Sequence, residues 1–330
     1  MTDREAMRGV FLDTYPLDQG DVDLGPLAAP LSGLDRYERT APEQLAERIA
    51  DVEVVLLNKV RLDRAALTLA KRLKLVVLSA TGTDNVDLDA AGELGVTVCN
   101  CRGYATASVV QHAIGLMLAL TTRLIDYDRA VRAHRWQRSR EFGVLDYPIH
   151  EVAGRTLGIV GYGELGRAVA QVAEALRMDV QVAERRGRDD VRPDRAPFEE
   201  VLETSDVLTL HCPLTPETRH LIDREALARM PAHALLINTA RGGLIDERAL
   251  ADALRRGAIG GAGVDVLSAE PPTEGNPLLE PDLPNVIVTP HAAWGSVEAR
   301  RRAIAQMAES IRTFIEVTPA RAVTDPPRPR

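Results

Sequence analysis

The 330-residue sequence is poor in cysteine and lysine, and it lacks long hydrophobic runs. Three cysteines, Cys99, Cys101 and Cys212, are too few for a disulfide framework, which favours a reducing compartment. Because they have no companion cluster of histidine or cysteine, we expect no metal site. No stretch of about 18 apolar residues is free of charge, and residues 1–8 lack the hydrophobic core of a signal peptide. The sequence therefore predicts a cytoplasmic protein without a membrane partner.

Lysine is almost absent among the cations, since only Lys59, Lys71 and Lys74 are lysines out of 40 basic residues. Runs of arginine in this chain consequently say little about function. The net charge of -8 argues against a nucleic-acid partner. The length and the 45% hydrophobic content predict about two domains with sizeable cores.

Short β-branched and leucine-rich segments alternate with helical patterns along the whole chain, which predicts an α/β fold with doubly wound parallel sheets. In the first third, strands are expected at residues 10–13, 53–57, 75–79 and 96–99. A second series is expected at residues 156–160, 180–183, 207–211, 234–238, 261–266 and 286–289. The apolar segment 109–120 predicts a buried helix, and a last helix, 296–314, precedes a Pro- and Arg-rich end at 325–330 that should be disordered.

A glycine-rich loop follows the first strand of the second series. It reads Gly161-Tyr162-Gly163-Glu164-Leu165-Gly166, the spacing of a dinucleotide-binding loop between a strand and a helix. The first glycine allows the tight turn, the second lets the backbone approach a pyrophosphate, and the third lets the helix pack on the strand. The helix N-terminus then faces the phosphates.

Glu184 ends the next predicted strand, about 20 residues after the glycine loop, where a carboxylate accepts the ribose hydroxyls of NAD. A carboxylate there also repels the 2'-phosphate of NADP, so we expect NAD. Arg185 and Arg186 follow directly, and an arginine at this place can instead bind that phosphate. NADP therefore remains an alternative.

Three later strands end in polar residues that a hydride-transfer enzyme would need, at Asn238 to Gly243, at Asp265 and at His291. Ligands of an open parallel sheet bind beyond the carboxyl ends of its strands. Reduction of a 2-oxo acid requires a cation for the substrate, a general acid, and a partner that keeps that acid protonated. Arg241, His291 and Glu270 offer these three chemistries.

At this point the sequence resembles the D-isomer-specific 2-hydroxyacid dehydrogenases over roughly residues 50–317. The matching motifs are Ala80 to Asp87, Gly161 to Gly166, His211 to Thr218, Asn238 to Gly243, Asp265 to Pro272 and Thr289 to His291. The resemblance implies that His291 is the general acid in reduction and the base in oxidation. It makes Glu270 the hydrogen-bonded partner of His291, and Arg241 the residue that orients the substrate.

The resemblance also implies further contacts with the cofactor and the substrate. Arg241 and His291 would contact both ligands. The cofactor contacts are Thr239, Ala240 and Asp265 at the nicotinamide, His211, Cys212 and Pro213 at the adenosine, and Thr218 near a phosphate or ribose. The backbone of Thr81 and Gly82 would take the substrate carboxylate.

The resemblance implies a discontinuous domain arrangement. Residues 1–104 and 295–330 would form a flavodoxin-like substrate domain, residues 105–294 an inserted Rossmann domain, and the active site the cleft between them. An arm near residues 125–152 would pair two subunits into a homodimer.

Segments 136–139 and 180–185 resemble the glycerate dehydrogenase, or hydroxypyruvate reductase, branch of the family. No regulatory module follows the last helix and no cluster for a phosphorylated substrate stands in the front domain, so we expect hydroxypyruvate or glyoxylate as substrate.

Two alternatives remain open. One is another dehydrogenase of this fold, of the phosphoglycerate, phosphite or formate type, although a formate dehydrogenase would carry an amide in place of Glu270. The other is a non-enzymatic NAD(H)-sensing protein like the corepressors of this fold.

Overall fold

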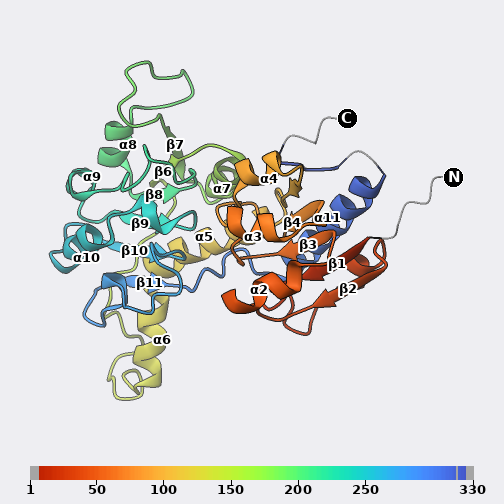
Figure 1. Cartoon of the computed structure of the whole chain (residues 1–330). Coiled ribbons are helices and arrows are strands. Elements are labelled where there is room, and N and C mark those ends of the chain that lie inside the picture. The colour runs from red at the N-terminus through yellow and green to blue at the C-terminus, as the bar shows by residue number, and fades with distance from the viewer. Residues whose placement is uncertain (1–6, 317–318, 325–330) are drawn as a thin grey trace. The chain divides into compact units, whose positions relative to one another are not determined.

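The computed structural model describes residues 7–316 and 319–324, and these fold into two compact units. The first unit is drawn from Met1–Ala105 and Gly295–Arg330, as far as the described residues reach, and the second is Thr106–Trp294. Each unit contains one parallel sheet with helices on its faces (Figure 1). The α/β class expected from the alternating pattern is therefore confirmed. The end at 325–330, expected to be disordered, lies outside the described residues.

The first sheet has the strand order β2-β1-β3-β4-β5, with all neighbours parallel. This is the flavodoxin-like order. The strands are β1 (Arg8–Phe11), β2 (Gly33–Arg36), β3 (Val54–Leu57), β4 (Leu75–Leu78) and β5 (Thr97–Cys99). Strands β3 and β4 are buried along their whole length, as their continuous apolar sequences predict. Strand β2 was not predicted, because the edge sequence Gly-Leu-Asp-Arg has a single large apolar residue.

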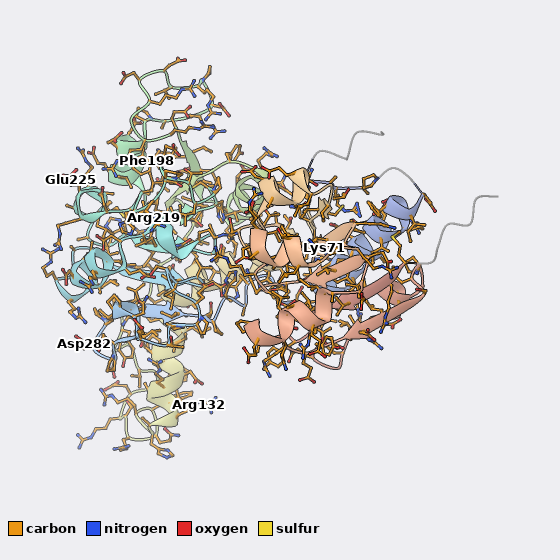
Figure 2. All side chains as sticks on the ribbon, viewed as in Figure 1. Lys71, Arg132, Phe198, Arg219, Glu225 and Asp282 are labelled. Atoms are coloured by element: carbon orange, nitrogen blue, oxygen red, sulfur yellow. The ribbon has the colours of Figure 1, made fainter. Side chains whose placement is uncertain are left out.

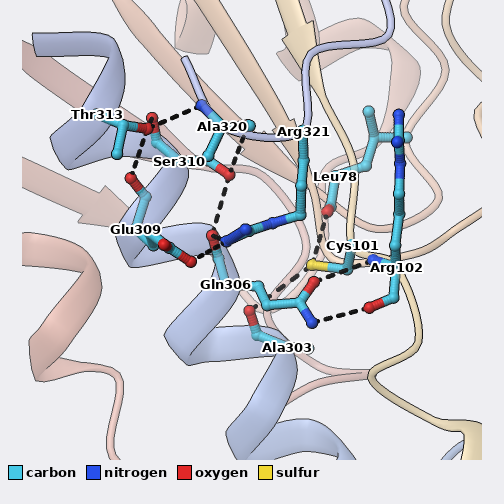
Figure 3. A network of polar contacts seen from close by, with 10 residues as sticks. All are labelled: Leu78, Cys101, Arg102, Ala303, Gln306, Glu309, Ser310, Thr313, Ala320 and Arg321. Atoms are coloured by element: carbon cyan, nitrogen blue, oxygen red, sulfur yellow. Dashed lines mark hydrogen bonds and ion pairs between the residues drawn. The ribbon is translucent and has the colours of Figure 1, made fainter. Parts of the chain in front are cut away.

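Helix α11 (Val297–Ile315) brings the C-terminal part of the chain into the first unit, beside the shorter helices of that unit. Those helices are α1 (Gly25–Ala28), α2 (Pro42–Ile49), α3 (Arg64–Leu69) and α4 (Leu88–Glu93). Figure 3 shows the polar contacts that hold α11: Gln306 accepts from Arg102 N at 2.9 Å and donates to Arg102 O at 2.8 Å. The buried Arg300 donates to both carboxylate oxygens of Asp21. The final helix is thus an integral part of the first unit.

The second sheet has the order β11-β10-β9-β8-β6-β7, again with all neighbours parallel. Its strands are β6 (Thr156–Val160), β7 (Asp179–Ala183), β8 (Val207–Leu210), β9 (Leu235–Asn238), β10 (Gly261–Val264) and β11 (Val286–Val288). Every strand lies where the sequence predicts one, with ends that differ by at most two residues. The strand order reverses between β6 and β8, because β7 lies on one side of β6 and all later strands lie on the other. Ligands of such sheets bind at the carboxyl ends of the strands beside this point.

Helices cover both faces of the second sheet (Figure 1). They are α5 (Thr106–Thr121), α6 (Leu124–Arg132), α7 (Glu164–Ala175), α8 (Phe198–Thr204), α9 (Arg224–Arg229) and α10 (Glu247–Arg255), with 3-10 turns at Gly242–Leu244 and Pro277–Leu279. Helix α5 buries Leu116, Met117 and Leu120 against α7 and the sheet, as its apolar sequence predicts. Within the described residues no single helix is long and apolar enough to cross a membrane. The bent pair α5 and α6 meets that criterion by length and composition alone.

Helix α6 and the segment that follows it, to about residue 152, project from the second unit (Figure 1). Figure 2 shows Arg132 on this projection, whereas Phe198 lies at the start of α8. The Tyr127 hydroxyl donates to Tyr147 O at 2.7 Å and closes the projection on itself. Several large apolar side chains on the projection are exposed in the single chain, among them Leu124, Trp136, Phe142, Leu145 and Ile149.

Candidate active site

The glycine loop joins β6 to α7 at the point where the strand order reverses. Gly161 has φ +95°, and a Cβ there would lie 2.5 Å from Cys212 N in the loop after β8. A Cβ on Gly166 would lie 2.2 Å from Gly161 O, whereas one on Gly163 would meet nothing within 4 Å. Gly161 and Gly166 are therefore required by packing. The open space at Gly163, the N-cap of α7, is where a phosphate group could approach the backbone.

Two buried polar atoms at the carboxyl ends of β8 and β9 have no hydrogen-bond partner among the described residues. They are His211 Nδ1 and Thr239 Oγ1. Burial lowers the pKa of His211 to about 4, so the ring is neutral near pH 7, and its Nε2 lies 3.0 Å from Thr209 Oγ1. Buried polar atoms normally find a partner. These two fit a site whose polar contacts a bound dinucleotide completes.

His291 and Glu270 form a direct hydrogen bond between His291 Nδ1 and Glu270 Oε2, 2.7 Å long. The other carboxylate oxygen of Glu270 accepts from Leu267 N at 2.8 Å. Because Nδ1 is engaged by the carboxylate, Nε2 is the ring nitrogen that can exchange a proton with a ligand. The histidine side chain is 27% exposed, so a ligand can reach it.

The loop that carries His291 is anchored on Asp265, which follows β10. His291 has the left-handed backbone angle φ +52°, and its N–H donates to Asp265 O at 2.7 Å. The buried Asp265 carboxylate accepts from Thr289 Oγ1, Ala292 N and Ala293 N at 2.5 to 2.9 Å. In this structure Asp265 fixes the histidine loop. Its contact with a nicotinamide carboxamide stays a prediction.

Arg241 stands in a tight turn after β9 that the buried Asn238 braces. The Asn238 side chain donates to Arg241 O at 2.9 Å and accepts from Ala240 N at 3.0 Å. A Cβ on Gly242 would lie 2.0 Å from the carbonyl carbon of Leu267, so the Arg241 turn lies against the segment that leads to Glu270. Strands β9, β10 and β11 are neighbours in the sheet, and Arg241, Glu270 and His291 therefore follow three adjacent strand ends.

Glu184 is buried at the end of β7, and its carboxylate is held by Arg192. Its oxygens accept from Arg192 Nε at 2.6 Å, Arg192 Nη2 at 2.7 Å and Arg185 N at 2.8 Å. The hydrogen bonds from Arg192 lower the pKa of Glu184 to about 2. The sequence did not single out Arg192, because nothing in an arginine-rich loop distinguishes it from its neighbours.

The remaining expected site residues lie in the loops that follow β8 and β4. The Thr218 hydroxyl donates to Pro213 O and accepts from Thr215 N, each at 2.7 Å, and so closes its own turn. Burial raises the pKa of Cys212 to about 11, which keeps its thiol protonated. Thr81 and Gly82 follow β4 in the first unit. Their contact with a substrate carboxylate stays a prediction.

A pocket of the second unit lies away from these residues. It has a volume of about 170 Å³ and includes Arg155, Asp206 and Leu235, which stand at the amino ends of β6, β8 and β9. The candidate catalytic side chains follow the carboxyl ends of the strands. We therefore assign the chemistry to the carboxyl ends and not to this pocket. The described residues contain no group of three or more histidine, cysteine, aspartate or glutamate side chains that could hold a metal ion.

A parallel sheet with a glycine loop at its reversal point, and a histidine hydrogen-bonded to a glutamate at the same ends of its strands, is the arrangement of a dinucleotide-dependent dehydrogenase. The model of the D-isomer specific 2-hydroxyacid dehydrogenase NAD-binding domain matches residues 114–293. The chain belongs to this family of oxidoreductases.

Known proteins show the same relationship. A glycerate dehydrogenase of Methylorubrum extorquens is 46% identical over 288 residues, which cover 87% of this chain and 90% of the relative. A hydroxypyruvate reductase of Blautia hydrogenotrophica is 35% identical and covers 96% and 99%. The crystal structure of the TT0316 protein from Thermus thermophilus has 33% identity and a TM-score of 0.83, covering 96% of this chain and all of that one. These relatives confirm the resemblance stated from the motifs.

The close contact at Gly242 yields a prediction about how the site is assembled. Alanine at Gly242 places a methyl group against backbone that cannot rotate away, which should cost about 1–3 kcal/mol of unfolding free energy. Gly243→Ala is the matched control, because its Cβ would meet only the flexible Leu214 side chain. Urea denaturation of both variants measures the difference. Equal stability of the two would contradict the packing of the Arg241 turn against Leu267.

Proposed function

We propose that the enzyme reduces hydroxypyruvate or glyoxylate to the D-2-hydroxy acid, and catalyses the reverse oxidation, with a nicotinamide dinucleotide. The observation that carries this proposal is the 2.7 Å hydrogen bond between His291 Nδ1 and Glu270 Oε2. It joins the segment after β11 to the segment after β10, the strand that Asp265 follows. The names of the Methylorubrum and Blautia relatives support a small, unphosphorylated substrate. Their sequences align with nearly the whole chain.

In the proposed reduction, His291 Nε2 donates a proton to the carbonyl oxygen of the substrate as that oxygen gains negative charge. When bound, the reduced nicotinamide supplies the hydride that is added to the carbonyl carbon. Glu270 stabilises the positive ring before the transfer and fixes the tautomer through Nδ1. In the oxidation, the same Nε2 removes the hydroxyl proton.

The guanidinium of Arg241 would bind the substrate carboxylate or carbonyl oxygen. Arginine suits this role because its planar fork forms two charge-assisted hydrogen bonds to one carboxylate. The bracing by Asn238 supports the role, since it fixes the backbone from which the side chain extends. The residues that would hold the dinucleotide are the backbone of Gly161 to Gly166, with His211 and Thr239 offering unpaired polar atoms.

The proposed function yields a prediction about the substrate. Purified enzyme should reduce hydroxypyruvate and glyoxylate with a higher kcat/KM than pyruvate, as followed by loss of NADH or NADPH absorbance. Arg241→Ala should lower kcat/KM by about 100-fold or more, since it removes a charge-assisted contact. Undiminished kcat/KM in that variant would remove Arg241 from the proposal. Cofactor binding without reduction of any 2-oxo acid would favour the sensing alternative.

A further prediction concerns the proton donor. Glu270→Gln weakens the hydrogen bond that holds the His291 ring, so kcat for reduction should fall while the reduced cofactor still binds. His291→Asn should lose about 100-fold to 10,000-fold in kcat while still binding the reduced cofactor. Steady-state kinetics with fluorescence titration of cofactor tests both variants. An undiminished kcat in Glu270→Gln would break the proposed pair.

The enzyme should act as a homodimer formed through the projection at residues 124–152. Its exposed apolar side chains support this, because Phe142 is 98% and Leu145 is 83% exposed in the single chain. A patch of this kind marks a protein-protein interface. The double change Phe142→Asp with Leu145→Asp should convert the dimer to monomers in light scattering. Arg132→Glu on the same projection is the control for charge alone, and a monomeric wild type would refute the proposal.

A further inference from the structure

The loop between β7 and α8 carries five of the chain's arginines within residues 185–195 and stands away from the sheet (Figure 1). Two of these arginines form ion pairs with aspartates that do not belong to strand β7. Arg186 pairs with Asp223 at 2.7 Å, and Arg195 pairs with Asp194 at 3.3 Å. Arg192 differs from both, because its partner is Glu184, the carboxylate at the position that would face the adenosine ribose.

Both oxygens of the Glu184 carboxylate already accept hydrogen bonds within the protein, so neither is available to a ribose hydroxyl. The two oxygens accept four hydrogen bonds, from Arg192 Nε, Arg192 Nη2, Arg192 N and Arg185 N. Four is about the number that an ionised carboxylate can accept. Its side chain is also fully buried. Glu184 therefore presents neither an acceptor nor an uncompensated charge to a cofactor.

Arg192 presents the opposite properties. A guanidinium has five N–H donors, of which the Glu184 carboxylate engages one on Nε and one on Nη2. The Arg192 side chain is 45% exposed, so the edge that faces away from Glu184 reaches solvent. The bidentate contact fixes the plane of the guanidinium. The buried acid thus holds an arginine in place with its remaining donors turned outward.

The neighbouring residue adds to the positive charge at the end of β7. Arg185 is exposed and directly follows Glu184, to which its backbone N–H is bonded. The loop also carries Asp189, Asp190 and Asp194, and of these Asp194 pairs with Arg195 and also acts electrostatically on Arg192. The hydrogen bonds to the Glu184 carboxylate come from Arg185 and Arg192. Phosphate is one of the two anions whose geometry the arginine fork matches, and it is the group that distinguishes NADP(H) from NAD(H).

We propose that Arg192, oriented by Glu184 and joined by Arg185, forms a subsite for the 2'-phosphate of NADP(H). The enzyme then uses NADPH at least as well as NADH, which reverses the preference that an acid at the end of β7 predicts. The inference deepens the proposed dehydrogenase function and rests on its cofactor site. The acid that would exclude the 2'-phosphate instead positions the cation that binds it.

The test is calorimetric titration with adenosine 2',5'-bisphosphate and with 5'-AMP, which differ by the 2'-phosphate and require no turnover. Wild type should bind the bisphosphate at least about tenfold more tightly, the size of one charge-assisted contact. In Arg192→Met the two affinities should agree within about twofold, with 5'-AMP binding retained as the sign of a folded site. Arg192→Lys should recover part of the difference, because it keeps the charge without the fork.

Arg188→Met is the matched control, since Arg188 is an exposed arginine of the same loop with no contact to Glu184. It should leave the ratio of the two affinities unchanged. The double variant Glu184→Gln with Arg192→Met removes both charges together, so it tests the subsite even if Arg192→Met alone does not fold. Equal binding of both nucleotides by wild type, or an equal loss in the Arg188 and Arg192 variants, would overturn the proposal. Neither result depends on whether a 2-oxo acid is reduced, so the proposed function is tested separately.

Discussion

The hydrogen bonds to the buried carboxylate of Asp265 fix the loop on which the geometry of the candidate site depends. A buried charge is tolerated only with hydrogen-bond donors around it, and here all three donors come from the segment Thr289 to Ala293. Satisfying Asp265 therefore fixes the left-handed turn of His291, and that turn brings the imidazole to Glu270. His112 on α5 lies 3.4 Å from the same carboxylate and links the long buried helix to this turn.

The strand order of the second sheet explains why the candidate site residues lie along one edge of that sheet. Parallel strands end at the same edge, so residues distant in sequence follow one another across β9, β10 and β11. Gly242 then allows two of the resulting loops to approach within backbone contact. The glycine loop meets the loop after β8 in the same way, through Gly161 and Cys212. Glycines at these contacts therefore set how closely the loops of the candidate site approach one another.

The sequence predicted the strands of the second sheet, because apolar runs report local structure directly. The motifs also predicted the hydrogen bond between His291 and Glu270. The sequence did not predict features that depend on contacts with residues distant in the chain. Strand β2 has almost no apolar pattern, since it lies at a sheet edge. Arg192 and Arg300 are indistinguishable by sequence from the exposed Arg188 and Arg301, because nearly every cation in the chain is arginine. Only the fold shows that one meets Glu184 and the other Asp21.

We propose that these residues carry out a stereospecific reduction of a small 2-oxo acid. The most direct test is chiral chromatography of the glycerate formed from hydroxypyruvate by the wild-type enzyme with reduced cofactor in excess. D-Glycerate is the expected product, formed in amounts equal to the cofactor oxidised. Formation of L-glycerate, or of no glycerate while the cofactor binds normally, would contradict the proposal.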